Sequence, residues 1–571
     1  MITLIPRDKG DKELRKVILF KEKLNMSHHI KNYALSGLVL VSLFAAACKK
    51  DKKATPDEPE EANTKQTATT NRRELTNDSL FLYAKQIYYW NSTLPSYDTY
   101  EPRKYNTLST DLANYDNNLF NIGKAAGGAD YEAGESSLKY SYIEDITSRN
   151  PVAALKNAQA SVDLEGNGND VGIRPVFYLT NNTTRAYILF ITAVYKGSDA
   201  DKKGVKRGWA ITKINGTAVG ANYENERSMV NNALNSDKVT IEGTKYSAKV
   251  PGEAFSVELS KKSYKSSPIY QAKIFTAGAR KIGYLAYARF SNQTNSIPVL
   301  DSIFKSFAGL GVTDLIVDLR YNGGGYVNTA EHLINLIAPA SATGVMYTEY
   351  FNTTLRDGKA VIMKNQPLLD DNDKVQFANN GRLINYFDDI DYSVKGNTNS
   401  FSKAGNLNNV TNIVFIVTGN TASASELVIN SLKPKMTVKL VGEQTYGKPV
   451  GFFPIRLENK YDVLMALFET KNALDEGGYF SGMVPDIRES NSDATFFDDP
   501  RYDFGDSAEP YTAKAIGILN PSNAAVSVKG KGSVMSINGK EVSFTTTNDM
   551  RPLKENDEFK GMIETRHRVK K

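Results

Sequence analysis

The sequence predicts a multi-domain α/β protein whose largest part is built on a parallel sheet. Two strand–turn–helix units indicate this class, one within residues 314–336 and one within residues 413–441. The chain has 571 residues, which at about 150 residues per domain corresponds to roughly three or four domains. We find no internal repeat.

Composition excludes several classes of protein. With 41% hydrophobic and 23% charged residues, the chain is neither collagen-like, nor fully disordered, nor a polytopic membrane protein. Its net charge is +6, from 70 basic and 64 acidic side chains, which is too little for a nucleic-acid partner to be predicted. The single cysteine, Cys48, excludes an internal disulfide and a cysteine-ligated zinc site, and we predict no metal and no cofactor.

Residues 1–47 are predicted to be a signal peptide. The apolar run 34–47 follows Lys31 and is too short for a bilayer about 30 Å thick, which takes roughly 20 helical residues. Met26 is an alternative start just upstream of the basic flank. The small residues before Cys48 resemble the lipobox of bacterial lipoproteins, which implies lipidation of Cys48; a free thiol after an ordinary secretory signal is the alternative.

A flexible tether is predicted to follow over residues 48–72, because this stretch is rich in Lys, Glu, Asp and Thr and poor in large apolar residues. The remainder would then lie outside the cytoplasm, anchored by lipid to the bacterial cell envelope. We expect the outer membrane, on its periplasmic side or at the cell surface.

A small helical domain is predicted over residues 73–155. Apolar residues recur at three- and four-residue spacing in residues 80–90, which is typical of an amphipathic helix.

Residues 160–262 resemble a PDZ domain. A strand, a short helix near Ser198, a glycine turn and a strand closed by Asn215-Gly216 follow one another. PDZ domains bind an extended peptide at a sheet edge and hold its terminal carboxylate with backbone N–H groups. The resemblance places that loop at Val171, Gly172 and Ile173; a glycine turn in another small β domain is the alternative.

The catalytic part is predicted over residues 266–520. A buried strand (314–319) leads through Gly323 to Gly325 into a helix (329–336), and a second strand (413–417) leads into a helix (423–432) and a further strand (438–441). The last two strands should be parallel, joined by a right-handed crossover. Residues 346–405 are polar and are interpreted as an insertion. Residues 521–571 form a further extension, with a hairpin expected around Asn538-Gly539.

Three features meet at one predicted edge of this sheet, since parallel strands end on the same side. They are the glycine turn, Ser423 at a strand-to-helix turn, and Lys448 after the next strand. The hydroxyl of Ser423 would be the nucleophile, and the N–H groups of Ala424 and Gly324 would stabilise a developing oxyanion. Lys448 fits the role of base if its amine is neutral. Lowering the pKa of a lysine from about 10.4 to near 7 disfavours the ammonium by roughly 4 kcal/mol, which burial in a dry pocket can supply.

An ordered series of motifs resembles the carboxy-terminal processing peptidases, also called tail-specific proteases. The segments are 281–284 (Lys-Ile-Gly-Tyr), 318–322 (Asp-Leu-Arg-Tyr-Asn), 421–426 (Thr-Ala-Ser-Ala-Ser-Glu), 442–448 (Gly-Glu-Gln-Thr-Tyr-Gly-Lys) and 484–487 (Val-Pro-Asp-Ile). The resemblance implies a ClpP/crotonase-like α/β core and a serine endopeptidase with a dyad of Ser423 and Lys448. It also implies an acyl-enzyme on Ser423 and a PDZ domain that presents the carboxy-terminal tails of protein substrates.

The chain departs from that family after the lysine. Family members commonly continue with Gly-Thr-Val-Gln, whose glutamine helps to orient the lysine, whereas this chain reads Pro449-Val450-Gly451-Phe452. Either another polar group, such as Ser425 or Glu426, holds the amine, or the protein is a slow or regulated variant. Ser425 and Glu426 are better explained as first-turn helix residues that favour the helix dipole than as catalysts. The alternative function is a catalytically impaired peptide-binding scaffold of the same fold.

Other residues have simpler interpretations. Of the four histidines, His28 and His29 lie in the predicted signal peptide and His567 lies near the end, which leaves His332 for a Ser-His hydrolase, a weaker hypothesis. His332 is better explained as a packing residue in a helix. Residues 370–373, which are rich in Asp, lack the spacing of a calcium loop and are interpreted as a solvated loop.

Overall fold

The computed structural model describes residues 66–148, 162–370, 374–489, 496–520, 534–537, 540–543, 551–553 and 560–563. The described residues belong to one compact unit. The predicted signal peptide, Cys48 and the tether up to residue 65 lie outside the described residues. Among the described helices, none has the length and apolarity to cross a bilayer.

The core of the unit is a six-stranded sheet that is parallel except at one edge, which confirms the predicted α/β class. Its order is β10 (Ile269–Ala277), β11 (Arg280–Tyr287), β12 (Asp314–Asp318), β16 (Asn412–Val417), β17 (Thr437–Gly442) and β22 (Ile487–Arg488). β10 pairs antiparallel with β11, and every later pair is parallel. The predicted parallel pair, β16 and β17, is therefore present.

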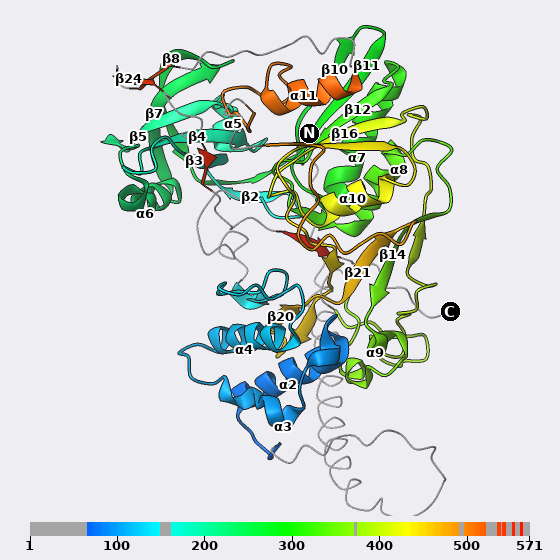
Figure 1. The fold of residues 1–571 in the computed structure, drawn as a ribbon. Helices are drawn as coiled ribbons and strands as arrows, with labels where there is room; N and C mark the ends of the chain where they lie inside the picture. Colours follow the sequence, from blue (N-terminus) through cyan, green and yellow to red (C-terminus); the bar gives the residue numbers. More distant parts are fainter. Residues whose placement is uncertain are drawn as a thin grey trace, which may run out of the picture. The chain divides into compact units, whose positions relative to one another are not determined.

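Helices cover both faces of this sheet (Figure 1). Side chains alternate along a strand, so Leu315 and Val317 face one apolar core while Ile316 faces another. The first core contains α7 (Gln293–Gly309), α8 (Val327–Ile337) and α10 (Ala424–Leu432), and the second contains α11 (Pro510–Leu519). Burial on both faces explains why these strands read as nearly continuous apolar runs.

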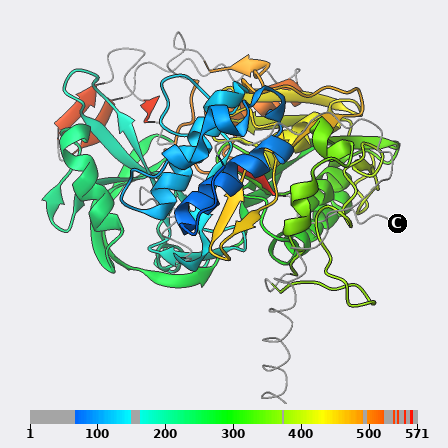
Figure 2. The ribbon, with the colours of Figure 1, turned by 90° about the horizontal axis from the view of Figure 1, so that it is seen from below.

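The predicted helical region contains two 16-residue helices that pack side by side, α2 (Arg72–Ile87) and α4 (Asp111–Ala126) (Figure 2). Asn71 and Thr110 cap their amino ends by accepting backbone N–H groups. The other elements here are η1 (Asn91–Thr93), α3 (Tyr97–Tyr100), η2 (Pro102–Lys104), β1 (Tyr142–Asp145) and η3 (Ile146–Ser148). β1 pairs with a strand over 300 residues later, so the region shares a sheet with the catalytic part.

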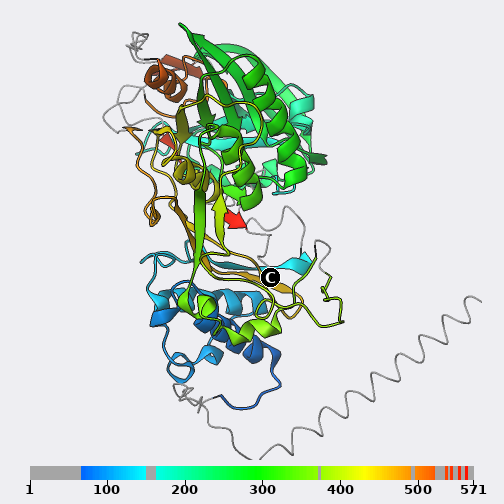
Figure 3. The same cartoon turned by 90° about the vertical axis from the view of Figure 1, so that its right-hand side faces the viewer.

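That sheet has three strands, β1, β20 (Tyr461–Leu464) and β19 (Ile455–Leu457). The predicted insertion adds β14 (Val345–Phe351), which pairs with β21 (Phe468–Asn472), as Figure 3 shows. The same four-stranded sheet contains β15 (Thr398–Ser400) and β18 (Val450–Gly451), and the short helices nearby are α9 (Thr353–Arg356) and η4 (Val361–Asn365). The region predicted to be a polar insertion thus contains a buried strand.

Residues 173–260 form an antiparallel sheet with the predicted order of strand, short helix, strand and Asn-Gly turn. The elements are β3 (Ile173–Leu179), β4 (Tyr187–Val194), α5 (Asp199–Lys202), β5 (Trp209–Ile214), β6 (Thr217–Ala218), α6 (Tyr223–Leu234), β7 (Lys238–Ser247) and β8 (Val250–Ser260). A two-stranded ribbon, β2 (Asn167–Asp170) and β9 (Lys262–Lys265), links this sheet to the catalytic part.

Late in the chain, β23 (Val534–Ile537) and β24 (Lys540–Ser543) form the expected antiparallel hairpin, whose turn residues lie outside the described part. Two further strands follow. β25 (Arg551–Pro552) pairs with β3, and β26 (Gly561–Ile563) pairs in parallel with β13 (Gly324–Tyr326) in the glycine turn.

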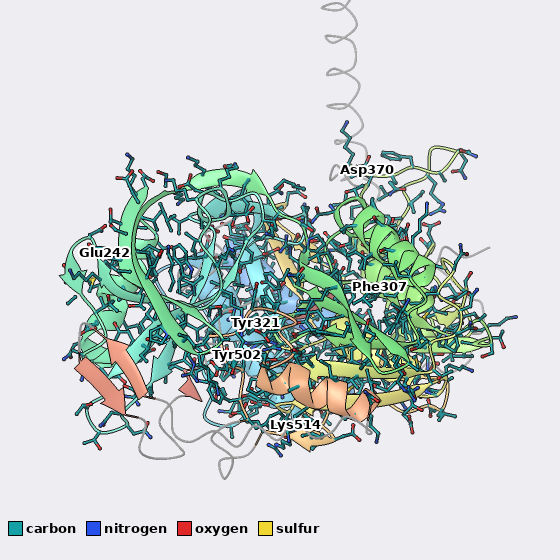
Figure 4. The ribbon with its side chains drawn as sticks, turned by 90° about the horizontal axis from the view of Figure 1, so that it is seen from above. Glu242, Phe307, Tyr321, Asp370, Tyr502 and Lys514 are labelled. Carbon is teal, nitrogen blue, oxygen red and sulfur yellow. The ribbon has the colours of Figure 1, made fainter. Side chains whose placement is uncertain are left out.

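A buried cluster of charges joins the β3–β8 sheet to the six-stranded sheet, near Tyr321 and Tyr502 in Figure 4. Arg320 pairs with Asp318, Asp498 and Glu509, and Arg207 also pairs with Asp498. Burial alone would raise the pKa of the Asp498 carboxyl, but the guanidinium groups of Arg207 and Arg320 hold it well below its usual range.

We expect Arg320→Met to lower the free energy of unfolding by about 3–5 kcal/mol, because it leaves buried carboxylates without their cation. The control is Arg185→Met, whose ion pair with Glu224 lies at the surface and should contribute less than about 1 kcal/mol. Urea denaturation of both variants measures the difference, and equal losses would contradict a structural role for the cluster.

Candidate active site

Ser423 occupies a strained turn between β16 and α10. Its backbone has φ 59° and ψ −110°, a conformation that L-residues with a Cβ rarely adopt. The side chain is 0% exposed, and within the described residues its Oγ has no hydrogen-bond partner. A strained strand-to-helix turn that presents an unbonded serine hydroxyl is the geometry of a nucleophile elbow.

The glycine turn helps to hold this conformation. Ser425 Oγ donates to Asn322 O at 2.9 Å, and Ala422 N donates to the same carbonyl at 3.2 Å. At the helix end, Leu427 N donates to Ser423 O at 2.8 Å. Backbone strain persists only where surrounding contacts impose it, and here they come from two different strand ends.

Lys448 lies beyond β17 and is also 0% exposed. Its Nζ donates to Lys560 O at 2.9 Å and to Tyr140 O at 3.3 Å, and it lies 4.3 Å from the centre of the Phe452 ring. Burial lowers the pKa of this amine to about 7, although the charges of Asp130 and Glu426 oppose the shift. A substantial fraction of the amine is therefore neutral at physiological pH.

Glu426 connects the two predicted catalytic residues. Its Oε2 accepts the backbone N–H of Ser423 and that of Lys448, each at 2.8 Å. Its Oε1 accepts from Thr445 Oγ1 and from Gly447 N. Burial raises the pKa of this carboxyl, while the four donors favour its ionised form, which can only accept. One carboxylate thus fixes the serine turn and the lysine loop against each other.

We expect Glu426→Gln to reduce the rate of any reaction at this site by about 10²-fold, because the amide NH₂ cannot accept the hydrogen bonds that one carboxylate oxygen now takes. The loss should appear in kcat rather than in KM, and the free energy of unfolding should fall by about 1–3 kcal/mol. Steady-state kinetics and urea denaturation test both points. An unchanged kcat would show that Glu426 positions nothing.

The two predicted oxyanion donors differ in their surroundings. Ala424 is the first residue of α10, so its N–H has no acceptor within the helix. Gly324 N donates to Asn322 Oδ1 at 3.0 Å, so this N–H serves an oxyanion only if that bond is exchanged. A Cβ on Gly324 would lie 3.0 Å from Ala424 N, which places the two residues next to each other.

The predicted carboxylate loop leads into β3, whose first residue is Ile173. Gly172 has φ 89°, and a Cβ there would lie 2.0 Å from Ser198 Oγ, so only glycine fits. Its N–H donates to Asp170 Oδ1 at 2.6 Å, and the carbonyls of Gly172 and Val171 accept from Tyr195 N and Ala200 N. Val171 and Ile173 point into the core of this sheet. The hydrogen bonds of Val171 and Gly172 are thus made within the sheet.

Of the two alternatives for the lysine, the one in which Ser425 or Glu426 holds the amine does not occur in the structure. Ser425 Oγ donates to Asn322 O, and Glu426 accepts the backbone N–H of Lys448 and not its Nζ. The carbonyls of Tyr140 and Lys560 accept from the amine instead. Sequence reasoning missed both, because a backbone carbonyl leaves no residue-type signal.

His332 has a partner outside this site. Its Nε2 lies 2.6 Å from Asp301 Oδ1, which joins α8 to α7. Within the described residues, no cluster of His, Cys, Asp and Glu could hold a metal ion. Asp370 lies at the border of the described part, and the rest of its acidic run, residues 371–373, lies outside it.

Comparison with known proteins gives a family. The model of peptidase family S41 matches residues 281–488. A protein named "Probable CtpA-like serine protease" in Staphylococcus aureus (strain bovine RF122 / ET3-1) is 24% identical over 395 residues, which is 67% of this chain and 67% of that protein. The chain spans about two thirds of the length of the first such relatives.

Two further proteins, one matched by sequence and one by structure, support the same family resemblance. The chloroplastic C-terminal processing peptidase of Tetradesmus obliquus is 24% identical over 262 residues, 44% of this chain and 46% of its own. The solved structure of a candidate S41 protease from Bacteroides fragilis NCTC 9343 matches with a TM-score of 0.51 at 19% identity, over 82% of this chain and 99% of that one, which shows a shared fold. The resemblance seen in the motifs is confirmed: residues 281–488 match peptidase family S41, and these relatives support the resemblance to the carboxy-terminal processing peptidases.

Proposed function

We propose that this protein is a serine endopeptidase in which Ser423 is the nucleophile and Lys448 the general base. The observation that carries the proposal is the Glu426 carboxylate, which accepts a backbone N–H from each of the two residues and so keeps them together. The unbonded Oγ of Ser423 and the desolvated amine of Lys448 supply a nucleophile and a base that operate near neutral pH.

The reaction then has two halves. Lys448 Nζ takes the proton of Ser423 Oγ as the oxygen attacks the substrate carbonyl, and the N–H groups of Ala424 and Gly324 stabilise the oxyanion. The ammonium returns the proton to the leaving amine, which leaves an acyl ester on Ser423. Lys448 Nζ then takes a proton from a water molecule as its oxygen attacks this ester, and the ammonium returns that proton to Ser423 Oγ as the carboxylic acid departs.

The substrates we propose are proteins with accessible, apolar carboxy-terminal tails. In support, the relative from Tetradesmus obliquus is named for C-terminal processing. The β3–β8 sheet has the strand and helix order of a PDZ domain, and the loop predicted to hold the terminal carboxylate (Val171, Gly172 and Ile173) leads into β3. To bind one, this loop would have to exchange the hydrogen bond from Gly172 N to Asp170.

We further propose a location at the bacterial cell envelope, outside the cytoplasm, with Cys48 carrying the lipid. The short apolar run before Cys48 and the polar stretch after it support this arrangement. Metabolic labelling with an alkyne fatty acid, with and without Cys48→Ser, tests it.

A catalytically impaired peptide-binding scaffold is the second candidate. One observation favours it: Phe452 occupies the position where family members commonly carry a lysine-orienting glutamine. The amine therefore contacts a ring and not an amide.

A pair of matched substrates separates the two candidates. One small folded protein carries an apolar carboxy-terminal tail, and its twin carries a tail of the same length rich in Asp. The peptidase cleaves the first much faster than the second and becomes labelled at Ser423 by a fluorophosphonate probe. A scaffold retains the apolar-tailed protein uncut and stays unlabelled.

A further inference from the structure

A segment late in the chain forms the middle strand between the glycine turn and the loop that follows Lys448. β26 pairs in parallel with β13 on one side, where Gly561 N donates to Gly323 O at 3.0 Å. On the other side Phe452 N donates to Met562 O at 3.2 Å, and Phe452 bridges in parallel with Ile563. The segment Lys560–Ile563, called here the β26 segment, thus occupies the strand position between the glycine turn and the lysine loop.

This segment contacts the proposed catalytic groups through its backbone. Lys560 O accepts a hydrogen bond from Lys448 Nζ at 2.9 Å. Gly561 O lies 2.4 Å from the place where a Cβ on Gly324 would be, and Ala424 N lies 3.0 Å from that same place. The backbone of this segment therefore contacts the amine of Lys448 and lies beside the two predicted oxyanion donors, Gly324 and Ala424.

The side chains of the β26 segment define three neighbouring positions. Met562 is 0% exposed and belongs to the main apolar core of the unit. Gly561 has no side chain and is buried against Gly324. Lys560 places its ammonium 4.4 Å from the centre of the Tyr446 ring, a cation–π contact. The strand position accordingly accepts a basic residue, then a small one, then a large apolar one.

A second late segment covers the other peptide-binding edge. β25 pairs antiparallel with the edge strand β3, and Leu553 N donates to Phe177 O at 2.8 Å. Leu553 also packs against the core of that sheet. Addition of an extended segment to a sheet edge is the way in which PDZ domains hold peptides.

We propose that the β26 segment is an intramolecular occupant of the substrate's strand position, and that it keeps the peptidase latent until a substrate strand displaces it. Substrates with a basic, a small and a large apolar residue in succession fit the same position best. This inference rests on the proposed function. It accounts for the complete burial of Ser423 and Lys448, because a peptidase whose nucleophile is covered by its own chain must be uncovered to act.

The test measures binding without catalysis. All proteins carry Ser423→Ala, and the probe is a fluorescein-labelled peptide with the sequence of residues 556–567. Met562→Asp would place a charge in the apolar core and expel the segment, so this variant should bind the probe at least tenfold more tightly than the otherwise unchanged chain. A chain lacking residues 560–571 should do the same. The matched control is Val250→Asp at an exposed apolar site, which should leave the affinity unchanged.

Two outcomes would overturn the occupancy. One is equal affinity of the probe for the chain with and without the segment; the other is equal binding of a probe that itself carries Asp at the position of Met562. If the deleted chain fails to fold, Met562→Asp still decides the result.

Latency is tested with Ser423 intact. Met562→Asp should cleave an apolar-tailed protein at least tenfold faster than the unchanged chain, and the peptide of residues 556–567 should inhibit it in trans. Equal rates despite tighter probe binding would overturn the latency. A protein that binds the probe but cleaves no substrate in any form would instead refute the proposed function and leave the occupancy standing.

Discussion

Ser423→Ala should reduce peptide cleavage by about 10³-fold or more while leaving the fold intact. Loss of a nucleophilic hydroxyl removes the covalent route, and only binding and oxyanion stabilisation remain. Because Ser423 Oγ has no hydrogen-bond partner in the described part of the chain, its removal breaks no such contact. Hydrolysis rates of an apolar-tailed substrate, measured beside the melting temperature, test both halves of this expectation.

Ser423→Gly is the matched variant, and it should be equally inactive but more stable. Replacing Ala by Gly normally destabilises a chain through backbone entropy. At φ 59° and ψ −110° the sign should reverse, because a Cβ is strained in this conformation and glycine is not. We expect Ser423→Gly to exceed Ser423→Ala in unfolding free energy by about 1 kcal/mol. If Ser423→Ala retained activity, or if glycine were the less stable variant, the assignment of a strained nucleophile would be wrong.

The strands around Ser423 could be predicted because the pattern of each strand is visible in its own residues. β12, β16 and β17 are buried on both faces of the sheet, so their apolar runs stand out, and glycines mark the turns that follow. The candidate dyad followed from these strands, since parallel strands end at one edge.

Long-range pairings could not be predicted in the same way. β1 and β20 have ordinary compositions, and only their partners across the fold determine that they meet. β14 lies in a stretch whose overall polarity suggested an insertion, although its own residues are buried against β21. Register and pairing depend on tertiary contacts, which composition and periodicity do not encode.

The groups that hold the Lys448 amine could not be predicted for a different reason. The amine is held by carbonyls of Tyr140 and Lys560, one before and one after the catalytic part. Any residue type could supply these groups. Glu426 is recognisable in the sequence as a first-turn helix residue that favours the helix dipole, but the bridge that it makes between two loops depends on how the chain folds.

The helical region affects the site through Asp130. Its carboxylate accepts the backbone N–H groups of Tyr140 and Ser141 at 2.6 and 3.1 Å, which fixes the carbonyl that holds the amine. Its charge also opposes the lowering of the Lys448 pKa. The residues before the catalytic part therefore contribute to the tuning of the proposed base.

The rate of cleavage should rise with pH through about 7 and then level off. The active form of Lys448 is the neutral amine, and burial lowers the pKa of that amine to about 7 in the folded chain, against an ordinary value of 10.5. Below this pH the proton stays on Nζ, so kcat/KM should fall about tenfold for each pH unit; above it, the base is already free. A profile of kcat/KM between pH 5 and 9 measures the midpoint in the free enzyme.

Lys448→Arg is the control, because a guanidinium stays protonated throughout this range and cannot accept the serine proton. This variant should lose about 10³-fold or more in rate at every pH, with no recovery toward pH 9. A midpoint near the ordinary lysine value would mean that the amine is solvated when the enzyme acts. A flat profile, or an active Lys448→Arg variant, would remove Lys448 from the reaction, because no proton would then need to leave that nitrogen before the hydroxyl attacks.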